Sequence, residues 1–133
     1  MIDFESEIFS SVATALRTAY PGINVESVEN YNPPSFPFVS LVEISNSTYT
    51  PTRDSSHGEN HAVVGFEANV YTNKTSGRKK EAKQIAESLD EAMTNLGFTR
   101  ISYVPASLDD ASKYRIVMRY NAIIDANGVI YRR

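Results

Sequence analysis

The sequence predicts an α+β fold: a mostly antiparallel sheet of about five or six strands with two helices packed on one face. Two segments have the three- and four-residue apolar spacing of amphipathic helices, and about six others have the pattern of strands. The expected order is α-β-β-β-α-β-β-β. Consecutive strands without an intervening helix favour antiparallel pairing. The 133 residues fit one domain, residues 1–133, because neither a repeat nor a low-complexity linker divides them.

The first third of the chain reads as a helix followed by two strands. Residues 3–20 are predicted to form the helix, which ends at Pro21-Gly22. A short strand is expected at about 23–28. The proline-rich segment Tyr31–Pro37 then predicts a stiff extended loop, because each proline fixes φ and restricts the residue before it. Residues 38–48 form the next predicted strand.

The clearest strand signal lies at residues 61–73, where apolar and polar side chains alternate. We expect the apolar face to be buried and the face with Glu67, Asn69 and Tyr71 to be open to water or a partner. The apolar set is Ala62, Val64, Phe66, Ala68 and Val70.

The second helix is expected at residues 77–96. Thr75 or Ser76 is the predicted N-cap, and Gly97 stands where a C-terminal glycine belongs. The apolar stripe of this helix includes Met93, which we interpret as a core residue.

Three strands are predicted to complete the domain. Two lie at about 98–104 and 113–125, and the second of these presents Met118 to the core. Asn127-Gly128 is a strong hairpin signal and predicts a short last strand through residues 129–132.

Composition excludes several classes of function. The net charge is −3, which argues against DNA or an anionic membrane as the main partner. There is no cysteine for a disulfide, a thiolate nucleophile or a Cys-based metal site. The start of the chain is acidic where a signal peptide would be basic, and no uncharged apolar run approaches the ~20 residues of a membrane helix.

The ligand-type residues do not form a convincing active site. Asp54, His57, Glu59 and His61 cluster in sequence, but their Ser- and Gly-bearing stretch reads as a polar loop rather than a metal site. The pair Asp109-Asp110 is interpreted as a loop or a helix cap. We therefore predict a protein that is not an enzyme and has no cofactor or metal.

Two features favour a subunit or partner contact. The connection Tyr49–Asn60 is long for a hairpin, so we expect it to order on a neighbour through Arg53, Asp54, His57 and Glu59. The second helix is basic at its start and acidic towards its end, against its macrodipole. Its charged residues are Arg78, Lys79, Lys80, Lys83, Glu87, Asp90 and Glu91. A solvated face is the alternative interpretation of these charges.

The chain as a whole resembles the tail terminator (tail completion, head-to-tail joining) proteins of long-tailed bacteriophages and their prophages. The order of elements in so short a chain, the entry Pro33–Pro37 and the helix start Gly77–Ala82 carry the resemblance. The most distinctive segment is the ending Tyr120–Arg133.

The resemblance implies a virion protein that forms a ring, commonly a hexamer, on the finished tail tube. Such a ring stops tube polymerisation and offers the surface that joins the head. Its partners would be other copies of itself, the tail tube protein and a head-completion or connector protein. The resemblance implies binding to neither a membrane nor a specific nucleic-acid sequence, although DNA would pass through the ring. It would sit at the head-proximal end of the tail after assembly in the bacterial host cytoplasm. Another neck or tail-completion protein, a minor tail-tube subunit and a small cellular binding domain remain alternatives.

Overall fold

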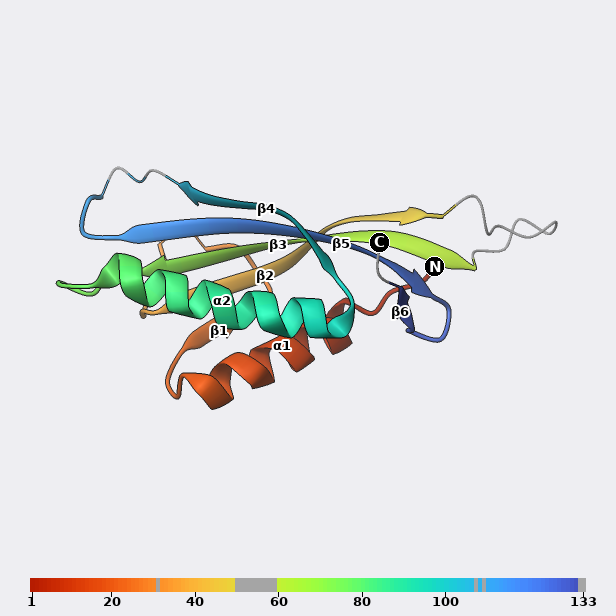
Figure 1. The fold of residues 1–133 in the computed structure, drawn as a ribbon, viewed down its shortest axis with the longest axis horizontal. Coiled ribbons are helices and arrows are strands. Elements are labelled where there is room, and N and C mark those ends of the chain that lie inside the picture. The colour runs from red at the N-terminus through yellow and green to blue at the C-terminus, as the bar shows by residue number, and fades with distance from the viewer. Residues whose placement is uncertain (31, 50–59, 107, 109, 132–133) are drawn as a thin grey trace.

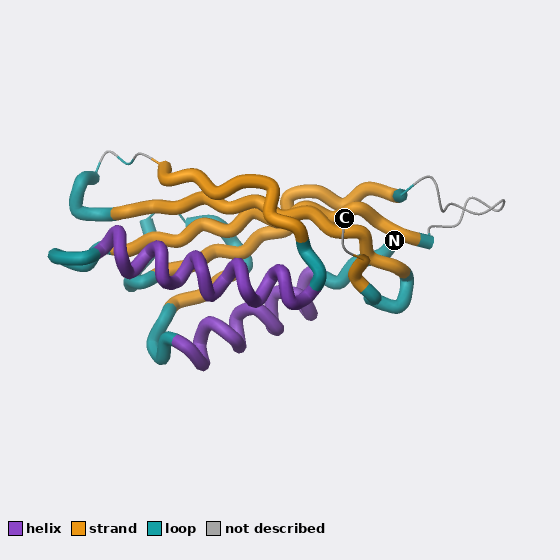
Figure 2. The backbone as a smooth tube through the Cα atoms, in the orientation of Figure 1, coloured by secondary structure: helices purple, strands orange, loops and turns teal. Residues whose placement is uncertain are grey.

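Two helices cover one face of a six-stranded sheet in the computed structural model (Figure 1), as the sequence predicts. The structure describes residues 1–30, 32–49, 60–106, 108 and 110–131. In chain order the elements are α1 (Glu5–Ala19), β1 (Asn24–Glu26), β2 (Phe38–Thr48), β3 (His61–Thr72), α2 (Arg78–Leu96), β4 (Thr99–Ala106), β5 (Tyr114–Asp125) and β6 (Ile130–Tyr131). The layered arrangement is also visible in Figure 2.

The strand order across the sheet is β1-β2-β3-β5-β4. The short strand β6 pairs with Ile123 and Ile124 of β5, just beyond the part of β5 that pairs with β4. All neighbours are antiparallel except β1 and β2, which run parallel. Antiparallel pairing of these first two strands, expected from their adjacency in sequence, is therefore wrong. A parallel pair needs a connection that returns along the strand, and the proline-bearing stretch before Phe38 is too long and too stiff for a tight hairpin.

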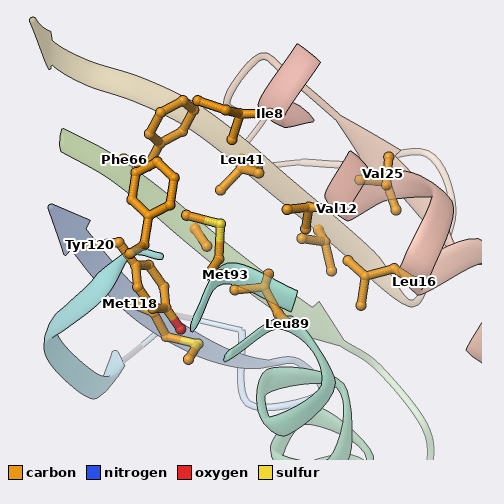
Figure 3. Packing of buried hydrophobic residues seen from close by; sticks show 14 of the residues in the cluster. Ile8, Val12, Leu16, Val25, Leu41, Phe66, Leu89, Met93, Met118 and Tyr120 are labelled. Carbon is orange, nitrogen blue, oxygen red and sulfur yellow. The ribbon is translucent and has the colours of Figure 1, made fainter. Parts of the chain in front are cut away.

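The main core lies between the sheet and the helices. Every apolar residue predicted to face inward from β3 is buried, from Ala62 to Val70. Met93 of α2 and Met118 of β5 are also buried, which confirms their interpretation as core. Figure 3 shows Phe66, Tyr120 and both methionines packed together with Leu89. These contacts fix α2 across the central strands.

The opposite face of the sheet is only partly open, which corrects the expectation for the second face of β3. Asn69 and Tyr71 are buried there, together with Ser40 of β2. The carboxylate of Glu29, in the segment after β1, accepts hydrogen bonds from the hydroxyls of Tyr71 and Ser40, each at 3.1 Å. The Arg115 guanidinium donates to Asn69 Oδ1 at 2.9 Å. A segment distant in sequence therefore covers this end of the face.

Glycines end the second helix and form the last hairpin, as expected. Gly97 is left-handed with φ of 111°, and Phe98 N–H donates to the Met93 carbonyl across it. Gly128 has φ of 85°, and the Asp125 carboxylate accepts the N–H groups of Asn127 and Val129. This turn directs β6 back against β5.

Candidate subunit interface

The predicted N-cap of α2 is wrong: Gly77, rather than Thr75 or Ser76, caps the helix. Gly77 is left-handed with φ of 82°, and no side chain in the described part of the chain makes a capping hydrogen bond at this helix end. The basic start of the helix therefore lacks the anionic or hydroxyl cap that usually offsets the positive end of the dipole. Glu81 is the acidic residue of its first turn.

Arg78 is used inside the subunit. Its guanidinium donates to the carbonyls of Lys74 and Thr75 and, at 3.0 Å, to the carbonyl of Ala111. It thereby joins the helix start to the connection between β4 and β5. Arg78 thus has a structural explanation that the sequence did not suggest.

The other cations of the helix start have no such role. Lys79, Lys80 and Lys83 are exposed, and none forms an ion pair among the described residues. They line an open surface hollow of about 580 Å³ together with Gly77, Gln84 and Glu87. We call Lys79, Lys80 and Lys83 the basic start of α2.

The acidic half of the helix borders a second groove, of about 300 Å³, between α2 and β4, and Glu87 lines both this groove and the hollow. We call the groove between α2 and β4 the acidic groove; its lining is Ala86, Glu87, Asp90, Glu91, Thr94, Arg100, Tyr103 and Met118. Glu87 and Glu91 are exposed and one helical turn apart. In the part of the chain that the structure describes, neither pairs with a cation.

Asp90 differs from its two acidic neighbours because it is engaged within the subunit. Its Oδ1 accepts the hydroxyl of the buried Tyr120 at 2.8 Å and lies 3.0 Å from the Arg100 guanidinium. Burial, and then the bond to this carboxylate, raises the pKa of Tyr120 well above its ordinary value. Asp90 holds β4 and β5 to the helix, a role that sequence spacing does not reveal.

Strand β4 adds an apolar strip that the sequence reasoning missed. Ile101, Tyr103 and Val104 are 56%, 36% and 52% exposed, on a strand whose one neighbour among the described strands is β5. Tyr103 lines the acidic groove, whereas Val104, the next residue, pairs with Val117 on the opposite face of the sheet; we call Ile101 and Tyr103 the apolar strip. A signal was present in the sequence, because Pro105 is typical of edge strands and Tyr103-Val104 breaks the alternation.

The residues predicted for the long connection, Arg53, Asp54, His57 and Glu59, lie outside the described residues. His61 starts β3, and its ring lies 5.4 Å from that of Tyr131 and 6.4 Å from that of Tyr49. Asp110 accepts hydrogen bonds from Ser112 in an exposed turn, in agreement with its interpretation as a loop residue.

Neither a metal-binding cluster nor a membrane-spanning helix is found among the described residues. No group of three or more His, Cys, Asp or Glu side chains in this part of the chain is placed to hold a metal ion. No helix among the same residues is long and apolar enough to cross a membrane.

Comparisons with known proteins identify a likeness of fold. No family model and no curated protein matches the chain. A chain in the virion of a native gene transfer agent particle shares the fold, with a TM-score of 0.63 and 18% identity over 87% of this chain and 92% of that one. The bacteriophage SPP1 gp17 protein is more distant, with a TM-score of 0.40 and 19% identity over 87% of this chain and 88% of that one. This second likeness is too weak to support an inference.

Proposed function

We propose that this chain is a structural, non-enzymatic protein of a phage-type particle. In this proposal it forms a ring, a hexamer in its commonest form, at the head-proximal end of the tail. The ring stops polymerisation of the tail tube and provides the surface to which the head joins. Its partners are other copies of itself, the tail tube protein and a head-completion or connector protein.

The observation that carries the proposal is the fold shared with a chain of a gene transfer agent virion over nearly the full length of both chains. The resemblance of the sequence to tail terminators supports the same role independently, because it depends on the amino-acid sequence and not on the fold. A third support is the charge pattern of α2, since a closed ring needs two different and complementary patches on each subunit.

Native mass spectrometry and electron microscopy of the purified chain test the proposal. A closed ring of fixed stoichiometry is expected, and the ring should cap purified tail tubes at one end and halt their growth in vitro. A continuous tube built by the chain itself would identify a tail-tube subunit instead. A chain that stays monomeric alone and in the presence of tubes would contradict the ring.

A further inference from the structure

We infer that the acidic groove and the apolar strip beside it form one docking surface, and that its occupant is the basic start of α2 from a second copy of this chain. This inference rests on the proposed ring and deepens it, because it names the two surfaces that meet at each contact between subunits.

The apolar strip argues that this side of the molecule is covered in the assembled protein. Ile101 is more than half exposed, and Tyr103, two residues further along the strand, joins it to the groove. Contiguous exposed apolar patches mark protein contact sites, and an uncovered sheet edge is a place where another chain can bind.

The backbone of β4 is poorly suited to extend the sheet into a neighbour. A bulge interrupts its register between Arg100 and Ser102, and Pro105 lacks an N–H donor. Both features limit open-ended strand pairing. Docking on this edge is therefore expected to use the side chains of the strip and the groove rather than backbone hydrogen bonds.

The charge of the groove selects a cationic occupant. Arg100 already neutralises Asp90 at 3.0 Å, whereas Glu87 and Glu91 have no cation partner among the described residues. Two exposed carboxylates one turn apart can accept ammonium groups from a facing surface. The occupant should therefore bring at least two cations.

The basic start of α2 has the matching charge but lies beyond the Glu87 end of its own groove. Lys80 and Asp90 are ten positions apart on one helix, which separates them by about 15 Å along the axis. Lys83 and Glu87 stand at i and i+4, in the less favourable order for such a pair, and no ion pair forms between them. In the inferred contact a second copy brings its lysines to the groove, and such a contact between two different surfaces repeats from copy to copy until a ring closes.

Complementary charge reversals test this contact. The chain with Lys79→Glu and Lys80→Glu carries acid at both surfaces, and the chain with Glu87→Lys and Glu91→Lys carries base at both. Each variant alone should need a protein concentration about tenfold higher than the parent to assemble at low salt. An equimolar mixture of the two should assemble like the parent, into rings with an even number of subunits in which the variants alternate.

Two matched controls separate the docking surface from general effects. Glu26→Lys reverses an exposed carboxylate on β1, away from both surfaces, and should leave assembly unchanged. Ile101→Ser should weaken assembly, whereas Val28→Ser, at a side chain 67% exposed outside the strip, should not. Circular dichroism and melting curves establish that each variant is folded.

The outcomes distinguish this inference from the proposed function. A parent that forms no ring contradicts the proposed function and the inference together. A parent ring with reversal variants that assemble equally well leaves the function standing and overturns the docking surface. Variants that lose assembly separately but are not rescued by mixing also overturn it, because the groove and the lysines would then meet different partners, such as the tail tube.

Discussion

Glu43 of β2 should make the stability of this protein fall as the pH rises. Burial first, and then the nearby carboxylates of Glu5 and Asp3, raise its pKa from 4.5 to about 7. Because the folded chain binds this proton more tightly than the unfolded chain, the free energy of unfolding decreases as the pH rises from 4.5 through about 7. Glu43→Gln keeps the shape of the side chain and removes its charge.

The magnitude follows from the difference between the two pKa values. At 1.36 kcal/mol per pKa unit the upper bound is about 3.4 kcal/mol. The side chain is partly exposed, so solvent screening reduces the effect to about 1 kcal/mol. With an unfolding entropy of about 2.1 cal/mol/K per residue, 1 kcal/mol corresponds to about 3 to 4 °C in Tm for a chain of this length.

Thermal and urea unfolding of the parent and Glu43→Gln, at pH 4 and pH 8 and at one protein concentration, measure the effect. The variant should be more stable than the parent at pH 8 and nearly equal to it at pH 4. Glu26→Gln, at an exposed carboxylate of β1, is the control and should change stability by no more than a few tenths of a kcal/mol. Equal stabilities of parent and variant at pH 8, or the same difference at both pH values, would refute the reasoning.

Three further predictions concern side chains, a turn and metal. Tyr120→Phe should lower the free energy of unfolding, measured in urea, by about 1.5–3 kcal/mol, because it removes the hydrogen bond from the buried Tyr120 hydroxyl to the Asp90 carboxylate. Tyr131→Phe, which removes a similar bond at an exposed side chain, should cost under about 0.5 kcal/mol. Equal losses would contradict the role of the buried bond between Tyr120 and Asp90. Gly97→Ala should cost about 1–3 kcal/mol more than Gly77→Ala in the same assay. Both glycines are left-handed, but a Cβ at Gly97 would lie 2.9 Å from Ile130 Cγ2, whereas a Cβ at Gly77 would have no heavy atom of the described residues within 4 Å. Similar costs would show that the crowding at Gly97 is relieved. A chelator should leave Tm unchanged, and a drop of many degrees would reveal a structural metal.

The candidate interface was only partly predictable. The sequence shows directly that the charges of α2 run against its macrodipole, and Lys79, Lys80 and Lys83 are exposed, as that pattern suggests. Asp90 looks equivalent to Glu91 in the sequence, yet it bonds Tyr120 and Arg100 inside the subunit. Such a bond depends on which strand crosses the helix at that turn, and helical spacing carries no information about a strand thirty residues away.

The sequence by itself determined the elements of this fold, because the periodicities of 3.6 and 2 are local properties. It placed β2 at residues 38–48, matched the bounds of β3 and β5 to within a residue, and identified the glycine that ends α2. Only the tertiary structure decided how these elements meet. In the tertiary structure β1 runs parallel to β2, and Glu29 accepts a hydrogen bond from the buried Tyr71. The apolar strip of β4 is exposed at an edge of the sheet. Pairing direction and burial depend on contacts between segments distant in the chain, whose free energies are comparable to or larger than local preferences.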